Sequence, residues 1–599
     1  MIEEIKNLVA LYESNNNDLA EIKVVNLINQ DPKNELLYNI YGLILLRKKK
    51  IIQAEIVLKK AIKLNPNYIE ALNNLGIALK DLKKYDEALK IYDEAIKLDY
   101  NFSILHNNRG IVLKNMEKYE DSITSYKVAV DQDPNYYDAY NNMGITYDKL
   151  NEFDFAISSF KKAILINQNY VEAYNNLASV YAKKKEYLNA IENYKKALEI
   201  KPSYDDAAHN LGHTYYLIDN LEYAIKYVSL SLNIDPDFAD AWNTLGMIHY
   251  KMGNLDLARK YYLKSINLNQ KLYKARYNLG VLMIRSGEYE TGWIEREPRR
   301  IEETGLIKNN LANLWDGKYV DGTLYIWREQ GIGDEISFSS NLSLLSKMAK
   351  EVVVEIDKRI QFLISRFFEK KNIKNIKVIG WDKDNPDSIQ KNIVKYEKHF
   401  PLGSLGLYLL NSKEKFLSVE FPYLIPDCNK NIFFKKKSED KKFKVGISWK
   451  TGNLEELHRN VNIEEFKDIF NIKNIEFYSL QFGECKSDIL SIKNKFNKEI
   501  KIIDEIDYKN DIESLASLIS ELDLVITIQN AIAHISCALG KETWVLVPLF
   551  CRNNWGVKGR KCDWYKTAVT YRQEKPFFWT SVLSNVYLDL SNRTKSNLN

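Results

Sequence analysis

The sequence has few cysteines, little excess charge and no long apolar run. Its five cysteines begin at Cys428 and form no CxxC pair, which favours reduced thiols over a disulfide framework. A formal net charge of +5 without a cationic stripe argues against nucleic acid as the main partner. No segment approaches the roughly 20 apolar residues of a membrane span, and the acidic start lacks the form of a signal peptide. We therefore expect a soluble, cytoplasmic protein with no transmembrane segment.

What the sequence does contain is a 34-residue repeat. A small residue stands at the ninth place of each unit, where two helices must approach closely: Gly42, Gly76, Gly110, Gly144, Ala178, Gly212, Gly246 and Gly280. This period and pattern are typical of the tetratricopeptide repeat, a helix–turn–helix unit that stacks into a superhelix with a groove. We expect an α-solenoid of about eight units over residues 34–305. Residues 1–33 are expected to form an N-terminal helical cap.

From Thr323 onward, short β-branched strands alternate with helices, which predicts parallel sheets with crossover helices. We expect two Rossmann-like, doubly wound α/β halves, residues 306–426 and 443–590. A lysine-rich linker, residues 427–442, is expected between them, and residues 591–599 are expected to form a disordered tail. Open α/β sheets bind ligands outside the carboxyl ends of their strands, so two such halves predict a cleft.

The first candidate site is the glycine turn formed by Gly331, Ile332, Gly333 and Asp334, at the end of the first predicted strand. Glycines permit a tight turn and a close approach of ligand to backbone. Asp334 is then expected at a helix start facing the cleft, where it could act chemically or only cap the helix. The turn lacks the complete dinucleotide fingerprint, so we expect no nicotinamide cofactor.

Two more candidate groups lie in the second half, with Gln481 at a further strand end on the same rim. The first group follows the strand LDLVITI at a predicted helix start: Gln529, Asn530, Ala531 and His534. Helix N–H groups there would accept a phosphate, and His534 could add a donor or only pack. The second group follows the strand KVGISW: Ser448, Lys450, Gly452, His458 and Arg459. These donors suit a pyrophosphate, unless the segment is only a solvated loop.

Five segments occur in an order that resembles a known family: WREQGIGDEISFSSNLSLL, YEKHFPLGSLGLYL, VGISWKTGN with HRNVNIEEF, YSLQFGE, and DLVITIQNAIAHISCALGKETWVLVP. Together they resemble the heptosyltransferase-like glycosyltransferase domain (glycosyltransferase family 9-like, GT-B fold). In many bacteria that domain is fused to tetratricopeptide repeats. The joining element, Gly292-Trp293 with Trp315-Asp316-Gly317, also resembles that family's. The overall plan is similar to O-linked N-acetylglucosamine transferase, whose repeats select protein substrates.

The resemblance implies a metal-independent, inverting transfer of a sugar from a nucleotide-sugar to an acceptor hydroxyl, with Asp334 as general base. Residues expected around the donor phosphates are Trp449, Lys450, Gly452, Arg459, Gln481, Gln529, Asn530, Ala531 and His534. The chain departs from the family's pattern at residues 529–531, at Val461 and Asn462, and at Glu335. The alternative is therefore a non-catalytic repeat scaffold with a degenerate transferase domain. A pure adaptor would lack a cleft in its second half.

Asparagine recurs at one place of the first helix of the units: Asn74, Asn108, Asn142, Asn176, Asn210 and Asn278. On a groove-lining helix, these amides could bind the backbone of an extended peptide, or they could only brace neighbouring helices. We expect a protein or peptide in the groove and a nucleotide-sugar in the cleft. No cofactor beyond that co-substrate, no metal and no nucleic acid are expected.

Overall fold

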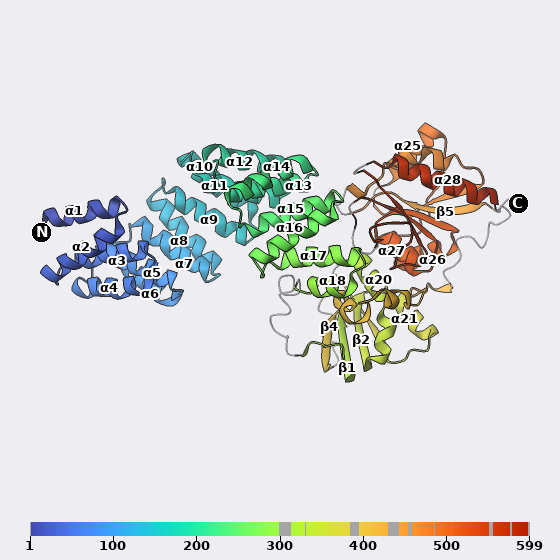
Figure 1. Ribbon diagram of the computed structural model, residues 1–599, viewed down its shortest axis with the longest axis horizontal. Helices are drawn as coiled ribbons and strands as arrows, with labels where there is room; N and C mark the ends of the chain where they lie inside the picture. Colours follow the sequence, from blue (N-terminus) through green and yellow to red (C-terminus); the bar gives the residue numbers. More distant parts are fainter. Residues whose placement is uncertain are drawn as a thin grey trace. The chain divides into compact units, whose positions relative to one another are not determined.

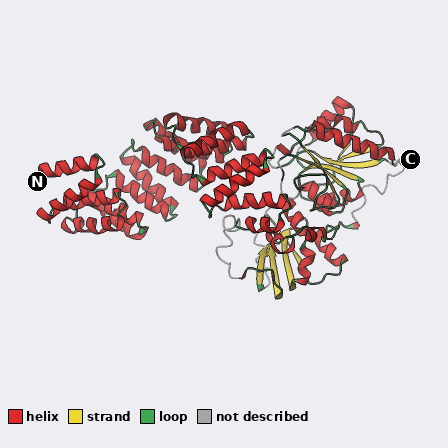
Figure 2. Ribbon diagram, in the orientation of Figure 1, coloured by secondary structure: helices red, strands yellow, loops and turns green. Residues whose placement is uncertain are grey.

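The computed structural model divides into two compact units, Met1–Pro236 and Asp237–Asn599, which we call the N-terminal and the C-terminal unit. The structure describes residues 2–298, 313–329, 331–383, 395–428, 442–452, 458–483, 485–549, 551, 555–575 and 578–596. The N-terminal unit is helical, and the C-terminal unit combines helices with two sheets (Figure 2). All ten tryptophans belong to the C-terminal unit, the first being Trp242.

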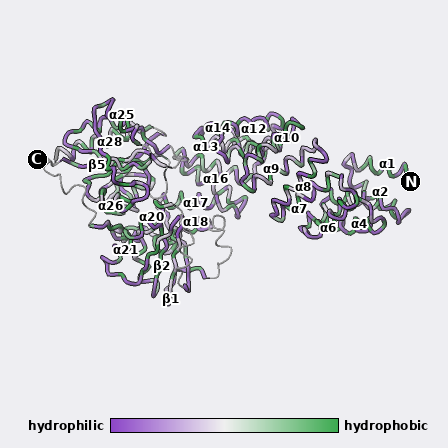
Figure 3. Tube along the Cα trace, turned by 180° about the vertical axis from the view of Figure 1, so that it is seen from behind, coloured by the Kyte–Doolittle hydropathy of each residue, from purple (hydrophilic) through white to green (hydrophobic). Residues whose placement is uncertain are grey.

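The N-terminal unit is an α-solenoid (Figure 1). Its helices are α1 (Ile2–Glu13), α2 (Asn17–Gln30), α3 (Glu35–Arg47), α4 (Ile51–Leu64), α5 (Ile69–Asp81), α6 (Tyr85–Leu98), α7 (Ser103–Asn115), α8 (Tyr119–Gln132), α9 (Tyr137–Lys149), α10 (Phe153–Ile166), α11 (Val171–Lys183), α12 (Tyr187–Ile200), α13 (Asp205–Leu217) and α14 (Leu221–Ile234). Hydrophilic and hydrophobic residues alternate along these helices (Figure 3). The expected solenoid is confirmed.

The glycine at the ninth place allows the two helices of a unit to pack. A Cβ added at Gly76 would lie 2.4 Å from the Tyr92 ring, which is fully buried between the helices. Equivalent contacts join Gly110 to Tyr126 and Gly144 to Phe160. The first helices of successive units, such as α5, α7 and α9, also contact one another. They therefore form a continuous surface, which we call the first-helix face.

The C-terminal unit begins with the last repeats, α15 (Ala239–Lys251), α16 (Leu255–Leu268), α17 (Tyr273–Arg285) and α18 (Tyr289–Arg296). The first sheet has the order β3-β2-β1-β4, with β1 (Val320–Trp327), β2 (Ala349–Asp357), β3 (Ile376–Trp381) and β4 (Lys398–Pro401). The second has the order β10-β9-β8-β5-β6-β7, with β5 (Phe443–Ser448), β6 (Ile475–Ser479), β7 (Ile500–Lys501), β8 (Leu524–Ile528), β9 (Thr543–Val547) and β10 (Ala568–Arg572). Within the described residues the strands of both sheets pair in parallel, which confirms the α/β character.

Helices connect and cover these strands. Those of the first sheet are α20 (Ile332–Ser339), the 3-10 helix η3 (Leu342–Lys347), α21 (Gln361–Lys370), α22 (Gly406–Leu409) and α23 (Lys413–Leu417). Those of the second are the 3-10 helix η9 (Ile463–Phe466), α24 (Lys467–Phe470), α25 (Lys486–Phe496), α26 (Ile512–Glu521), α27 (Ala531–Ala538) and α28 (Thr580–Ser596). One buried cluster spans the first sheet and residues of α26 and α27, so the two halves share a core.

The last repeats contact both α/β halves. Trp293 is fully buried, and its indole N–H donates to the carbonyl of Leu410 at 3.0 Å. On the side of the second half, the hydroxyl of Tyr289 donates to Asp563 at 2.6 Å. The guanidinium of Arg285 donates to the carbonyl of Leu549 at 3.1 Å. These repeats are thus part of the C-terminal unit rather than an extension of the N-terminal one.

The chain end differs from its prediction. A disordered tail from residue 591 is wrong for residues 591–596, because α28 continues to Ser596. The helix is held by the fully buried Leu590 and by the Arg593 guanidinium, which donates to Glu542 Oε2 at 2.7 Å. Residues 597–599, most of the linker and residues 299–305 at the end of the solenoid lie outside the described residues. The five cysteines are free thiols, as expected.

Candidate active site

The glycine turn leads from β1 into α20. Gly331 is the N-cap residue, with φ −92° and ψ 166°, and Asp334 lies in the first turn of the helix. The backbone N–H of Asp334 donates to the carbonyl of Gly331 at 3.0 Å. Asp334 therefore does not cap this helix, and the interpretation of its side chain as an N-cap is wrong. Its carboxylate is partly exposed at the carboxyl end of β1.

Gly333 brings the two halves together. A Cβ at this position would lie 3.2 Å from His534 Cδ2 and 3.9 Å from the Cα of Ala531. At Gly331, by contrast, a Cβ would meet no atom within 4 Å. The close contact explains the glycine at 333, and it places α20 next to the start of α27.

The start of α27 is organised by Asn530, its N-cap residue. The side-chain oxygen of Asn530 accepts the N–H of Ala533 at 3.3 Å, and its amide donates to Ser448 Oγ at 2.8 Å. The first N–H groups of a helix have no partner within it. Those of Ala531 and Ile532 are therefore suited to donate hydrogen bonds to an anion, and the helix dipole favours an anion there.

Arg459 adds positive charge at this place. Its side chain is only 5% exposed, and its guanidinium donates to the carbonyl of Gln529 at 3.3 Å. Gln529 was predicted to contact the donor phosphates. Its side chain is buried, so only its backbone could do so. A buried cation and the positive end of a helix repel each other, which destabilises the native state. An anion bound between them would be attracted to both and would offset that repulsion.

His534 is both packed and close to the turn. Its Nδ1 lies 2.8 Å from the hydroxyl of Tyr565, and its ring lies 5.2 Å from that of Trp555. The residue is 8% exposed. The packing interpretation is therefore correct for one side of the ring, while the other side faces Gly333.

Gln481 holds the loop after β5 in place. Its side-chain oxygen accepts the N–H groups of Trp449 and Lys450 at 3.0 and 2.8 Å. Its amide donates to the carbonyls of Lys450 and Phe482 at 3.1 and 3.0 Å. With its carboxamide used in this way, Gln481 braces strand ends, and the predicted direct contact of this group with a donor is not supported.

The loop after β5 departs from the prediction in two further places. Trp449 is fully buried in the core of the second half, with its indole N–H donating to Asp488 at 2.9 Å. Its ring therefore cannot line the donor site. The ammonium of Lys450 lies 2.6 Å from the same carboxylate. Gly452 packs against Phe482, whose ring would lie 2.7 Å from a Cβ at that position.

A buried ion pair that the sequence did not reveal lies behind Asp334. Glu335 is fully buried and accepts from Arg328 Nε and from the backbone N–H of Asp357, each at 2.7 Å. Arg328 lies 3.9 Å above the centre of the Trp381 ring. Burial raises the pKa of Glu335 to about 7, and Arg328 opposes that rise. The only signal in the sequence was the departure from the family's pattern at Glu335.

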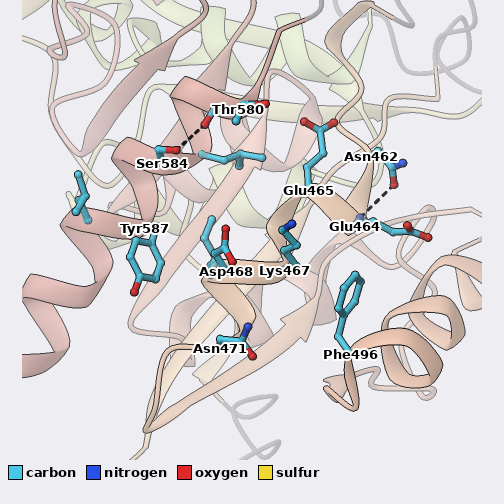
Figure 4. Close-up of a pocket in the computed structure, with 13 residues that line it drawn as sticks. Asn462, Glu464, Glu465, Lys467, Asp468, Asn471, Phe496, Thr580, Ser584 and Tyr587 are labelled. Carbon is cyan, nitrogen blue, oxygen red and sulfur yellow. Dashed lines mark hydrogen bonds between the residues drawn. The ribbon is translucent and has the colours of Figure 1, made fainter.

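Two of the cavities in the described part of the C-terminal unit differ in their position. The larger, about 1000 Å³, lies between η9, α24 and α28 and contains none of the predicted site residues (Figure 4). A smaller one, about 300 Å³, lies beyond the ends of β6 and β7 and is lined by Gln481, Gly483, Lys486 and Tyr508, among others. Ligands of parallel sheets bind beyond the carboxyl ends of strands, so the smaller cavity fits the site better.

The asparagine ladder braces the stack. Each side-chain amide donates to an asparagine of the preceding unit, 35 residues earlier, at 2.8–3.3 Å: Asn74 to Asn39, Asn108 to Asn73, Asn142 to Asn107, Asn176 to Asn141, Asn210 to Asn175 and Asn278 to Asn243. The bracing interpretation is therefore correct. Asn74 is buried, whereas the other five are partly exposed and keep part of the amide accessible.

Among the described residues, no helix is both long and apolar enough to cross a membrane, and no group of three or more metal-ligating side chains occurs. Models described as tetratricopeptide repeat or TPR repeat match residues 36–68, 69–100, 115–151, 137–170, 171–204 and 239–272. The chain is similar to Protein FlbA of Caulobacter vibrioides, with 24% identity over 285 residues, 45% of this chain and 47% of that protein. It thus spans about half the length of this curated relative.

Solved structures that are similar to this chain superpose on it with low TM-scores. The Cut9–Hcn1 hetero-tetramer of the APC/C is 16% identical, covering 45% of this chain and 52% of that chain with a TM-score of 0.37. YrrB, described as a TPR protein with an unusual peptide-binding site, is 24% identical, covering 31% and 95% with a TM-score of 0.27. From the family matches, the chain carries tetratricopeptide repeats between residues 36 and 272.

Proposed function

We propose that the protein is a glycosyltransferase that moves a sugar from a nucleotide-sugar to an acceptor hydroxyl, while its repeats bind a protein acceptor or partner. The observation that carries this proposal is the contact of α20 with the start of α27, at Gly333 and His534. It puts Asp334, a partly exposed carboxylate, beside a helix start that favours an anion.

This arrangement suits a single displacement. Asp334 accepts the proton of the acceptor hydroxyl, whose oxygen attacks the anomeric carbon of the donor sugar. The bond from that carbon to the diphosphate oxygen breaks, and negative charge develops on the leaving diphosphate. In this proposal, the N–H groups of Ala531 and Ile532 and the guanidinium of Arg459 stabilise that charge. The cavity beyond β6 and β7 would hold the nucleoside.

A second candidate is a non-catalytic scaffold with a degenerate transferase domain. This candidate is favoured because two side chains that were predicted to bind the donor instead form bonds within the protein. Lys450 pairs with Asp488, and the carboxamide of Gln481 is bonded to backbone. In a scaffold, these contacts would stabilise the fold and no donor would displace them.

Thermal unfolding of the full chain with a panel of nucleoside diphosphates and nucleotide-sugars separates the two candidates. A bound ligand stabilises the native state by RT ln(1 + [L]/Kd), or about 2.7 kcal/mol at a hundredfold excess over Kd. A transferase predicts a shift specific to one nucleotide, and Arg459→Gln should reduce it. A flat response across the panel from folded protein would reject the transferase and leave the scaffold.

A further inference from the structure

Charged side chains bond to one another along the edge of the first sheet where its strands have their carboxyl ends. The first of them is Glu335, which follows Asp334 in the first turn of α20. Glu335 accepts from Arg328, just after β1, and from the backbone N–H of Asp357, the last residue of β2. These bonds join the turn that carries Asp334 to the end of the neighbouring strand.

Arg359 continues this series of bonds. Its guanidinium contacts the Asp357 carboxylate at two points, with Nε 2.8 Å from Oδ1 and Nη2 2.7 Å from Oδ2. Its backbone N–H also donates to Oδ1, at 3.0 Å. A two-point contact fixes the plane of a guanidinium, and therefore the direction of its third nitrogen. We call Glu335, Asp357 and Arg359 the rim network.

The third nitrogen of Arg359 reaches the second half. Its Nη1 donates to the backbone carbonyl of Lys509 at 2.9 Å. Lys509 ends the segment 502–509, which follows β7 and forms one wall of the cavity of about 300 Å³. The rim network therefore connects the turn of Asp334 in one half with a wall of the proposed nucleoside cavity in the other.

The cavity wall is bonded internally. The hydroxyl of Tyr508 accepts the backbone N–H of Ile503 at 3.1 Å, and the Asp507 carboxylate accepts the backbone N–H of Lys509 at 3.0 Å. These bonds tie the residues that line the cavity to the segment that carries the Lys509 carbonyl. A ligand that orders the wall therefore also orders the acceptor of Arg359.

We propose that Arg359 is a positioning residue that couples nucleoside binding in this cavity to the placement of Asp334. The nucleoside orders the wall, and the wall holds Arg359. Arg359 in turn holds Asp357 and, through it, Glu335 and the first turn of α20. Because coupling between two sites is reciprocal, correct placement of Asp334 also tightens nucleoside binding. The inference rests on the proposed function, to which it adds how donor binding prepares the base.

A second arginine of the first half provides a comparison. Arg366 of α21 binds Glu513 of α26, with Nη2 2.5 Å from Oε2. It also donates to the carbonyl of Ile425 at 3.3 Å. Arg366 thus joins the two halves as Arg359 does, but through partners that do not belong to the rim network.

Hydrogen–deuterium exchange of the full chain tests the coupling, with uridine, guanosine, adenosine and cytidine as probes. A nucleoside has no phosphate for the start of α27, so it can act on α20 only through the cavity. The nucleoside that binds should slow exchange several-fold in peptides covering residues 332–339 and 352–357. Arg359→Gln should abolish this protection at saturating nucleoside, and Arg366→Gln should retain it.

Turnover supplies a second measurement. Arg359→Gln should lower the kcat of the transferase on the order of tenfold, because small misplacements of a reacting group are costly. Arg359→Lys should not restore kcat, since an ammonium lacks the planar fork that holds Asp357 and the Lys509 carbonyl together. Arg366→Gln should leave kcat unchanged. Thermal unfolding without ligand checks that each variant is folded.

Several results would overturn the proposal and leave the transferase proposal standing. These are protection of residues 332–339 that persists in Arg359→Gln, an equal loss of protection in Arg366→Gln, and a nucleoside that binds without slowing exchange there. Binding of a nucleoside diphosphate but of no nucleoside would also overturn it, because the cavity would then hold no nucleoside. A flat response of the folded chain to every nucleoside and nucleoside diphosphate would reject both proposals.

Discussion

Two repeats, one in each unit of the protein, meet the same packing requirement in different ways. At the ninth place of a repeat, a Cβ on Gly76 would meet ring atoms of Tyr92, at the end of a side chain. At the corresponding Gly280 in the C-terminal unit, a Cβ would lie 2.6 Å from the backbone N of Arg296 and from the carbonyl oxygen of Gly292. Side chains can move aside and a helix backbone cannot, so glycine is convenient at Gly76 and required at Gly280.

The hydrogen bonds of the two units also differ in their reach along the chain. In the ladder, donor and acceptor are 35 residues apart, as in the bond from Asn142 to Asn107. In the C-terminal unit, Asn530 and Ser448 are 82 residues apart, and Tyr250 donates to the carbonyl of Cys551, which is 301 residues away. A substitution in the ladder therefore affects only one repeat and its neighbour. The α/β site instead depends on residues from distant parts of the sequence.

The largest expected effect concerns catalysis, which only the C-terminal unit is proposed to support. Asp334→Asn removes the proton acceptor while keeping the shape of the side chain. If the transferase proposal holds, turnover should fall about 10²–10⁴-fold with nucleotide-sugar affinity retained. Steady-state kinetics and calorimetric titration measure the two quantities. Asp321→Asn, an exposed carboxylate on β1, is the matched control. Unchanged turnover in Asp334→Asn would remove the assignment of the base.

The second prediction tests the glycine comparison directly. Gly280→Ala should reduce the free energy of unfolding of the C-terminal unit by about 1–3 kcal/mol, because helix backbone blocks the new methyl group. Gly76→Ala should cost less than about 1 kcal/mol, since Ala178 already stands at this place in another unit. Urea unfolding followed by tryptophan fluorescence reports on the C-terminal unit alone, and far-ultraviolet circular dichroism reports on both. Equal costs would contradict the comparison.

The third prediction concerns pH. The pKa of Glu335 is raised from 4.5 to about 7 by burial, so the native state binds this proton more tightly than the unfolded chain. Its contribution is therefore fully present below pH 4.5 and is lost as pH rises through 7. We expect the C-terminal unit to lose on the order of 2 kcal/mol of stability between pH 5 and 8 from this group. Glu335→Gln should flatten that part of the urea-unfolding profile, and an unchanged slope would assign the pH dependence to other groups.

The smallest effect compares two buried tyrosines. Tyr565→Phe removes the hydroxyl next to His534 Nδ1 and should cost about 1 kcal/mol. Tyr92→Phe in the N-terminal unit should be neutral or slightly stabilising, because the buried hydroxyl of Tyr92 has no hydrogen-bond partner among the described residues. Chemical denaturation of both variants checks the pair. A cost at Tyr92 equal to that at Tyr565 would show that the hydrogen bond to His534 does not stabilise the fold.

Much of the fold could be predicted because it is periodic or strongly patterned. The repeat places the solenoid helices, and the apolar runs locate β1, β2, β5, β8 and β9. The edge strands β4 and β10 and the helix α25 were not predicted. A strand as short as Lys398–Pro401 has too few residues to show the alternation of apolar and polar side chains that identifies a strand. The helix α28 ends in a polar stretch, whose composition is typical of a disordered tail. The anchoring of α28 by the buried Leu590 is a tertiary effect.

The candidate site was predicted less completely than the fold. The packing of α20 against α27 brings the glycine turn and the start of α27 together, and the sequence indicated both ends of that contact. It did not indicate which of the candidate side chains would form hydrogen bonds or ion pairs within the protein and so be unable to contact a ligand. Trp449 is fully buried, whereas the adjacent Lys450 is partly exposed. Both side chains bond to Asp488, which lies 39 residues after Trp449 in the sequence. Such partners are chosen by packing across the sheet, which no local pattern contains.

The attachment of α15–α18 to the α/β halves has a consequence for biosynthesis. The N-terminal unit is formed by local contacts and can fold as it leaves the ribosome. The last repeats emerge next, but Trp293 and Tyr250 are covered or bonded by segments around Leu410 and Cys551 that are translated later. Until then, the end of the solenoid exposes apolar surface. We therefore expect nascent chains halted between residues 300 and 400 to bind chaperones more strongly than chains halted before residue 236.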